Sequence, residues 1–220
     1  KYKVKDLLYG LMLESYNDCA VILAEHAAGS TENFAKKLNA EARSYGAKST
    51  HFVTPNGLDR TDKNGIHSTT AYDLALIMKQ CIKNKEFLEI TRAKSHSFHD
   101  ASGKRSFTCN NHNALLSMMD GAVSGKTGFT SKAGYCYVGA VKKNGMTMIA
   151  VVLACGWPPH KTYKWSDVRT LVDYGAKNYS YHKIIPDYSK LTDLYVNGGM
   201  EHKVSIEAKG GGMTLLLKKG

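Results

Sequence analysis

Hydrophobic residues recur at helical spacing in the first part of the chain. Apolar positions three and four residues apart predict an amphipathic helix over 4–13, and an almost wholly apolar run ending at Gly29 predicts a second over 19–28. Residues 15–18 interrupt this pattern with side chains that compete for backbone hydrogen bonds. We therefore expect a polar turn, beginning at Ser15, between two buried helices.

Capping residues and apolar spacing predict further helices. Ser30 or Thr31 can cap a helix that runs to Tyr45, and Thr69 or Thr70 can cap one that runs to about residue 83, with Asp73 placed for a capping interaction. Shorter or later helices are predicted over 86–91 and 160–179. The intervening segment 48–68 contains two turn signals and is expected to be a loop.

The middle of the chain is predicted to form strands. Residues 95–108 are typical of a hairpin, and the runs 135–142 and 146–154 flank Asn144-Gly145, a strong hairpin signal. A strand over 124–130 is expected beside this hairpin. These elements predict an α+β fold in which helices flank an antiparallel sheet.

The character of the chain changes after Pro186. Short strand-like runs at 194–196, 203–206 and 213–217 are separated by glycines. Residues 187–220 are too few to bury an independent core, so we interpret them as the start of a small C-terminal β module. The expected organisation is one domain over 1–183, with its N-terminal portion absent, and a partial module over 187–220.

Composition limits the classes of partner. The chain is 43% hydrophobic, as globular proteins are, and 30 Lys and Arg against 19 Asp and Glu give a net charge of +11. That charge favours polyanionic surroundings such as nucleic acid, anionic lipid or an acidic cell-wall polymer. Without a nucleic-acid-binding motif, no nucleic-acid partner is expected. No apolar run suits a membrane helix, and the start lacks the apolar core of a signal peptide.

No metal or cofactor site is predicted. The five cysteines are widely spaced without a Cys-x-x-Cys pair, which argues against a zinc site or a disulfide framework and favours buried thiols. The histidines show no ligand spacing, and His67 beside Ser68 is interpreted as structural. Gly125-Lys126-Thr127 is similar to the end of a phosphate-binding loop, but Asp120 stands where that motif needs glycine.

Two separated motifs suggest a specific chemistry. Ser15-Tyr16-Asn17 lies between buried helices, and Lys126-Thr127-Gly128 lies far downstream on a predicted strand. Taken alone, Ser15 and Asn17 could cap the second helix and Lys126 could be a solvated strand lysine. Four further stretches extend the pattern: Asp6 to Leu13, His51 to Leu58, His67 to Asp73, and Phe129 to Tyr135.

In this order the motifs resemble those of the D-alanyl-D-alanine carboxypeptidases among the low-molecular-mass penicillin-binding proteins. The resemblance runs from about Lys5 to Tyr179 and implies a β-lactamase/transpeptidase-like fold. It implies that Ser15 passes a proton to the leaving amine and that Asn17 orients the substrate amide. It also implies substrate-binding residues, which are Lys126 and Thr127 for a terminal carboxylate, Gly128 for close approach, and the Phe129 N–H for the oxyanion.

The family's nucleophile is absent from the expected place. It belongs to a Ser-x-x-Lys motif upstream of Ser-x-Asn, at the start of a helix, in a part of the fold that also holds N-terminal strands. No serine precedes Ser15, and Ser180 to Lys183, the one Ser-x-x-Lys match, is interpreted as coincidental. We expect the nucleophile and its lysine to lie outside this chain, so that a chain starting at Lys1 forms no covalent penicillin adduct.

The resemblance implies a serine-type D-Ala-D-Ala carboxypeptidase that removes the terminal D-Ala from peptidoglycan stem peptides through an acyl-enzyme and is inhibited by β-lactams. Two alternatives remain open, a serine β-lactamase of the same fold and a noncatalytic cell-wall-binding homologue. Tyr16 stands where class A β-lactamases carry Asp, which favours the carboxypeptidase. The implied location is extracytoplasmic, where positive charge suits peripheral association with the membrane or an anionic wall polymer.

Overall fold

The computed structural model describes residues 1–185, 187, 191–206 and 210–220. The chain divides into two compact units, Lys1–Gly175 and Ala176–Gly220. The assignment of 1–183 to a penicillin-binding domain and of 187–220 to a β module stays a prediction. Residues 188–190 and 207–209 of that module lie outside the described residues.

The sheet of the first unit is antiparallel, as predicted. Its three strands are β5 (Ala122–Thr130), β6 (Gly134–Lys143) and β7 (Met146–Val152), in the spatial order β5-β6-β7. Asn144 and Gly145 both have positive φ, at 52° and 74°, which is the backbone of a tight hairpin turn between β6 and β7. In the part of the chain that the structure describes, β5 pairs only with β6, so β5 is an edge strand of this sheet.

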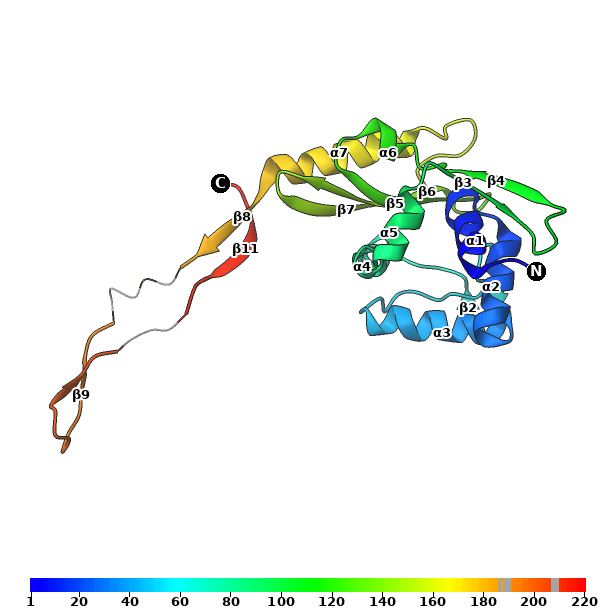
Figure 1. The fold of residues 1–220 in the computed structure, drawn as a ribbon. Coiled ribbons are helices and arrows are strands. Elements are labelled where there is room, and N and C mark those ends of the chain that lie inside the picture. The colour runs from blue at the N-terminus through cyan, green and yellow to red at the C-terminus, as the bar shows by residue number, and fades with distance from the viewer. Residues whose placement is uncertain (186, 188–190, 207–209) are drawn as a thin grey trace. The chain divides into compact units, whose positions relative to one another are not determined.

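Helices cover both faces of the sheet (Figure 1), among them α7 (Tyr163–Asn178) on one face and α4 (Ala71–Cys81) and α5 (Lys85–Arg92) on the other. The short helix α6 (Leu115–Met118), which the sequence did not predict, packs beside β5. Burial of apolar side chains between the α6 and α7 side and the sheet fixes this arrangement. The buried residues of this core are Leu115, Tyr137, Val141, Ala150, Val168 and Val172.

The N-terminal helices differ from the prediction on both sides of Ser15. The first helix is α-helical only as α1 (Val4–Tyr9) and continues as a π-helical turn η1 (Gly10–Glu14). The next helix, α2 (Asn17–Ala28), starts two residues before the predicted 19, so the polar turn is shorter than expected. Its N-cap residue Tyr16 makes no side-chain capping bond, so neither Ser15 nor Asn17 acts as the cap.

These helices share a second core with the hairpin β3 (Ser95–His99) and β4 (Ser106–Asn110), which was predicted. Its buried residues are Tyr9, Leu13, Ile90, Phe98 and Cys109. All five cysteines of the chain are free thiols, and Cys19, Cys109 and Cys155 are buried.

Helix capping follows the predicted residues with one correction. Ser30 caps α3 (Thr31–Ser44), and Thr70 caps α4 by accepting the Asp73 N–H. The Asp73 carboxylate does not complete a capping box. One of its oxygens instead accepts the Ser49 N–H and the Thr50 hydroxyl, both at 2.7 Å, so this buried carboxylate anchors the start of the 48–68 loop, which precedes α4.

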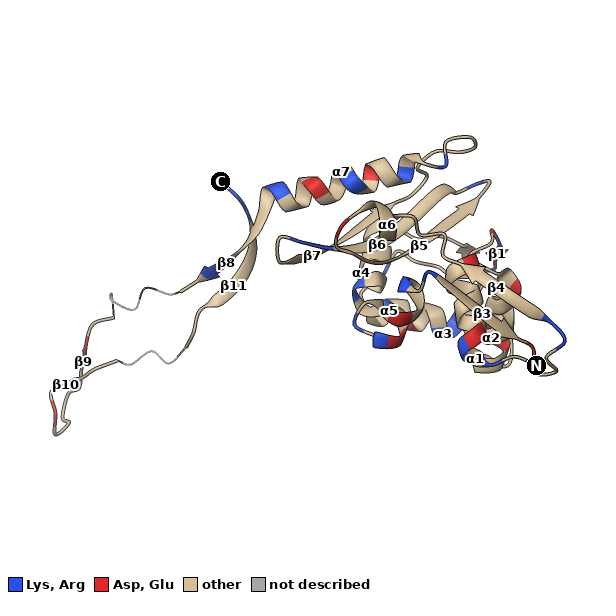
Figure 2. Ribbon diagram, turned by 45° about the horizontal axis from the view of Figure 1, so that its top comes forward, with Lys and Arg blue, Asp and Glu red and all other residues tan. Residues whose placement is uncertain are grey.

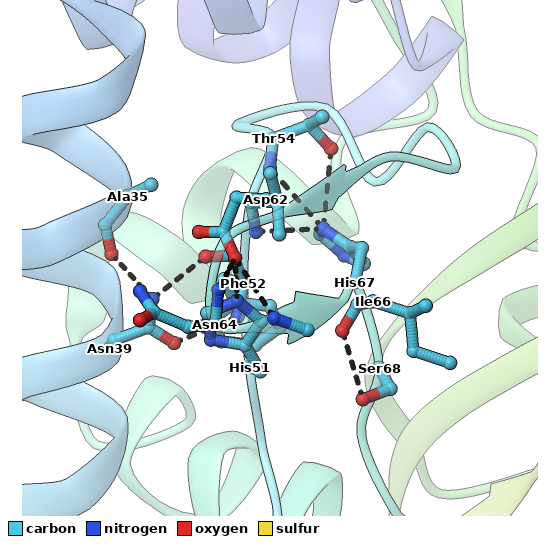
Figure 3. A network of polar contacts seen from close by, with 12 residues as sticks. Ala35, Asn39, His51, Phe52, Thr54, Asp62, Asn64, Ile66, His67 and Ser68 are labelled. Carbon is cyan, nitrogen blue, oxygen red and sulfur yellow. Dashed lines mark hydrogen bonds and ion pairs between the residues drawn. The ribbon is translucent and has the colours of Figure 1, made fainter.

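The predicted loop over 48–68 is anchored by side chains at several points and contains a small ribbon of two strands, β1 (Thr61–Asp62) and β2 (Gly65–Ile66). Figure 3 shows Asn39 of α3 beside Phe52, whose N–H and C=O it binds at 2.7 Å each. His51 contacts the Asp62 carboxylate at 2.9 Å. These side-chain contacts supplement the few ladder hydrogen bonds of the loop.

His67 holds the same loop through an acceptor nitrogen (Figure 3). Its Nδ1 accepts the N–H groups of Val53 and Thr54 at 3.0 and 3.2 Å, so the ring must be neutral at that atom. Burial is the main cause that lowers the pKa of His67 from its ordinary value of 6.5, with the neighbouring His51 adding to it and Asp59 opposing it. This confirms the structural interpretation of His67.

The second unit consists of paired short strands. β8 (Tyr179–Ile184) pairs with β11 (Met213–Lys218), and β9 (Leu194–Tyr195) pairs with β10 (Lys203–Val204), all antiparallel. The last three lie at the predicted runs, whereas β8 was not predicted as a strand. Ser180 and Lys183 both lie on β8, which is no helix start, in agreement with the interpretation of their motif as a coincidence.

The His67 geometry predicts a loss of stability in mild acid. Because the pKa is lowered by folding, His67 contributes stability above its ordinary pKa of 6.5, and this contribution is lost as pH falls from there through the lowered folded value. His67→Gln keeps an acceptor oxygen without a titrating group, so its Tm should fall less between pH 7.5 and 5. Equal pH dependence of Tm in both proteins would contradict the assignment.

Candidate active site

Ser15 occupies a strained turn between the two N-terminal helices. Its backbone lies in the left-handed region, with φ 60° and ψ 37°, which residues other than glycine rarely adopt. The preceding π-helical turn directs the N–H groups of both Ser15 and Tyr16 to the carbonyl of Gly10. Such turns are frequent at functional sites, and here the turn leaves the Ser15 side chain exposed.

Lys126, which lies on β5, contacts this turn. Its ammonium donates a hydrogen bond to the Ser15 hydroxyl and a second one, at 2.8 Å, to the carbonyl of Thr127. Removal from water lowers the pKa of Lys126 to about 8. Lys126 is therefore not the solvated strand lysine of the simpler interpretation, and its charge is present at neutral pH and is lost as pH rises through about 8.

The outer edge of β5 presents backbone groups to solvent. On the inner side, Tyr135 of β6 binds Gly156 O and Cys155 N with its own N–H and C=O, at 2.9 and 2.8 Å, so these groups point away from β5. Tyr135 is the register partner of Phe129. In an antiparallel ladder such a pair exchanges no hydrogen bonds, so the N–H of Phe129 also points outward, to the free edge.

Lys126 and Thr127 reach that edge from opposite faces of the sheet, because successive side chains of a strand alternate. Lys126 lies on the face of Ser15, whereas Phe129 stacks near Tyr135 on the other face, at a ring centroid distance of 4.6 Å. Gly128 is exposed between them, and a Cβ placed on it would meet its nearest atom at 3.9 Å. A ligand touched by both side chains must therefore lie along the edge.

Asn17 is the first residue of α2 and its side chain is exposed, two positions beyond Ser15. The fold thus brings Ser15 and Lys126 into contact, and places Asn17 next to them along the chain. Thr127, Gly128 and Phe129 follow along the edge of β5. The roles of all six residues stay predictions.

Three contacts that hold β5 were not predicted. On the Ser15 face the Ser124 hydroxyl lies 2.7 Å from that of Thr91 on α5, with both side chains buried. At the end of the strand the Thr130 hydroxyl donates to Asp59 of the 48–68 loop at 3.2 Å. The sequence shows the serine and threonine hydroxyls but not their partners, which are distant along the chain.

The third contact lies on the opposite face, where Tyr137 fills the space over two facing glycines. A Cβ on Gly125 or Gly139 would lie 2.1 or 2.3 Å from the Tyr137 hydroxyl. That hydroxyl donates to Asn113 at 3.0 Å, and burial raises the pKa of Tyr137. Gly125 thus admits the tyrosine that supports the strand just before Lys126.

Neither a metal site nor a membrane helix is found in the part of the chain that the structure describes. No group of three or more His, Cys, Asp or Glu side chains there is arranged to hold a metal ion. Among the same residues, every helix is too short or too polar to cross a bilayer.

Comparison with known proteins identifies the family. Residues 1–156 match the sequence model described as D-alanyl-D-alanine carboxypeptidase. The chain belongs to the D-alanyl-D-alanine carboxypeptidase family. The resemblance and the α+β fold predicted from the sequence are thereby confirmed.

Relatives of this family resemble the chain over most of its length. D-alanyl-D-alanine carboxypeptidase DacF of Bacillus subtilis is 30% identical over 99% of the chain and 54% of its own length. DacB2 of Mycobacterium tuberculosis is 37% identical over 79% of the chain and 58% of its own length. A solved carboxypeptidase of M. tuberculosis matches with a TM-score of 0.71 at 34% identity, covering 79% of this chain and 64% of that one. The chain spans little more than half the length of the curated relatives.

The packing of Tyr137 predicts that alanine is harmful at one glycine of β5 and tolerated at another. Gly125→Ala places a methyl group against the buried Tyr137 ring and should destabilise the protein by about 1–3 kcal/mol. Gly128→Ala serves as the matched control, since its methyl group meets no atom closer than 3.9 Å, and its Tm should stay near wild type. Equal Tm values of the two variants in thermal unfolding would show that Tyr137 does not support the strand.

Proposed function

We propose that this chain forms the substrate-holding part of a serine-type D-Ala-D-Ala carboxypeptidase whose nucleophilic serine, with its lysine, lies outside these 220 residues. The substrate is a peptidoglycan stem peptide, and β-lactams inhibit by acylating the same serine. One observation carries the proposal. In this member of the family, the Lys126 ammonium donates a hydrogen bond to the Ser15 hydroxyl. The contact lies beside the edge of β5 that is unpaired among the described residues, which suits an extended peptide.

The substrate binds as an additional strand on β5. A peptide ending in D-Ala presents a carboxylate, which lies at the edge where Lys126 approaches from one face and Thr127 from the other. The ammonium and the hydroxyl give it charge-assisted hydrogen bonds. Gly128, which has no side chain, lets the peptide backbone approach the strand closely, and main-chain hydrogen bonds along the edge add affinity.

The bond-breaking steps use the groups around this edge. Attack of the nucleophilic serine, whose proton passes to its own lysine, on the carbonyl carbon of the penultimate D-Ala places negative charge on the carbonyl oxygen, which the outward N–H of Phe129 stabilises. The C–N bond then breaks, and the Ser15 hydroxyl passes a proton to the leaving amine of the terminal D-Ala while it takes up the proton that the lysine removed from the nucleophile. Asn17 orients the substrate amide during this step. Water finally hydrolyses the ester to release the shortened peptide.

The sheet also has room for the strands that family members place before Ser-x-Asn. Among the described residues β7 pairs only with β6, so its outer edge is free. An apolar groove of ≈ 310 Å³ runs beside it, lined by α4, β7 and α7. Strands of the N-terminal portion pair with this edge in the proposal, and the nucleophile that follows them then lies in the same domain as Lys126.

The location proposed for the protein is the cell envelope, outside the cytoplasmic membrane. Figure 2 shows Lys and Arg on several elements, interleaved with Asp and Glu on α7, instead of in one patch. The net charge of +11 is therefore spread over the chain, and its electrostatic attraction favours association with anionic wall polymer or lipid headgroups. Peripheral association with such a surface is part of the proposal.

The activity is tested with the full-length protein that contains this chain. It should release D-Ala from a peptide ending in D-Ala-D-Ala and form a covalent penicillin adduct visible by intact-mass spectrometry. The 220 residues alone should form no adduct, because the nucleophile is absent from them. Rapid nitrocefin turnover by the full-length protein would favour a β-lactamase, and failure of both D-Ala release and acylation would favour a noncatalytic wall-binding protein.

The role of Lys126 predicts a selective effect on free carboxylates. In the full-length protein, Lys126→Ala should lower kcat/KM on the order of 100-fold for a peptide ending in D-Ala-D-Ala, because a charged contact with the substrate is lost. The same peptide with a C-terminal amide should lose far less. Lys142→Ala, on the exposed end of β6, is the matched control and should leave both values near wild type. Equal losses on acid and amide would refute the carboxylate contact.

A further inference from the structure

Glu14 connects the Ser15 turn to a distant loop. One carboxylate oxygen accepts the backbone N–H of Asn110 at 2.6 Å, and the other lies 2.6 Å from Nε2 of His112. Asn110 is the last residue of β4, and His112 follows it in the segment that joins β4 to α6. The Glu14 side chain is only 16% exposed. None of the steps proposed above uses this residue.

Glu14 is charged across the neutral range. The Asn110 N–H is the main cause that holds the pKa of Glu14 below its usual value, and the hydrogen bond and charge of the His112 imidazole act in the same direction against partial burial. A carboxylate bound on both oxygens in this way has little freedom to rotate. Its backbone, at the last residue of η1, is correspondingly fixed.

This matters because Ser15, the next residue, has an unfavourable backbone conformation. A left-handed residue other than glycine persists only where the surrounding structure imposes it. On one side the π-helical turn directs the Ser15 N–H to Gly10, and on the other α2 begins at Asn17. Glu14 supplies the link between this short turn and the end of β4, where Asn110 lies 96 residues away along the chain.

We propose that Glu14 is a positioning residue that holds Ser15 in its left-handed conformation, with its hydroxyl against Lys126. The inference rests on the proposed function, since Ser15 is the group that it positions for proton transfer. Without the two contacts of Glu14, Ser15 relaxes toward an unstrained backbone and its hydroxyl leaves the ammonium. Displacements of about 1 Å at a catalytic group can lower a rate 100-fold.

The chain offers a matched control for removal of a carboxylate–histidine pair. Asp6 of α1 lies 2.9 Å from Nε2 of His96 on β3, in the same helical region but away from the Ser15 turn. Asp6→Ala therefore removes a comparable contact between a helix and the β3–β4 hairpin without touching Glu14. It separates a general loss of stability from a loss of Ser15 geometry.

The experiment measures penicillin acylation rates and Tm for variants of the full-length protein. Glu14→Ala should lower the second-order acylation rate constant about 10- to 100-fold, whereas Asp6→Ala should lower Tm and leave that constant within about two-fold, since nearly all molecules remain folded below Tm. Glu14→Gln keeps an acceptor for the Asn110 N–H and should restore most of the rate. In a Ser15→Ala background, Glu14→Ala should cause no further loss, because it acts through Ser15.

Either of two results would overturn the inference. One is acylation of Glu14→Ala as fast as that of Asp6→Ala, and the other is full additivity of the effects of the Glu14 and Ser15 substitutions on the acylation rate constant. If the wild-type protein is not acylated at all, the proposed function fails. A crystal structure of Glu14→Ala then tests by itself whether Glu14 holds the backbone of Ser15. Departure of Ser15 from the left-handed region would support the positioning role. Retention of φ near 60° would refute it.

Discussion

The candidate site depends on a strand that is held on every side except one. β6 pairs with the inner edge of β5, the Thr91 hydroxyl on α5 binds Ser124 from one face, and Tyr137 supports Gly125 from the other. Among the described residues, no strand pairs with the outer edge of β5. An unpaired edge normally invites uncontrolled strand pairing, and here it carries the charged side chain of Lys126. The same feature makes it suitable for a peptide of defined chemistry.

Lys126 combines two properties that a fully solvated lysine does not have. Partial burial lowers the pKa of Lys126 to about 8. The Ser15 hydroxyl and the Thr127 carbonyl accept hydrogen bonds from its ammonium and fix the direction of the side chain. An ammonium near its pKa can bind an anion while charged and exchange a proton with a neighbouring hydroxyl. This physical state agrees with the proposed capture of a carboxylate next to a proton-transferring serine.

Local chemistry in the sequence was enough to place most elements. Ser30, Thr70 and the Asn144-Gly145 pair each specify a cap or turn through bonds to nearby residues, so their predictions were confirmed. Predictions were wrong where a distant partner intervened. Asp73 binds the loop at Thr50 instead of capping its own helix, and the first helix changes to a π-helical turn as it packs against the β3–β4 hairpin. α6 and β8, which lack a strong period, were missed.

By itself the sequence determined the α+β class, the residue types of the two motifs and, through the order of those motifs, the family. It could not determine that Lys126 touches Ser15, that the Phe129 N–H points to a free edge, or that Glu14 binds Asn110 and His112. The contacts of Lys126 and Glu14 join residues about a hundred positions apart along the chain, and the direction of the Phe129 N–H depends on the register of β5 against β6. Helix periods and turn preferences act over a few residues, whereas such contacts exist only after the helices have packed on the sheet and burial has fixed their positions.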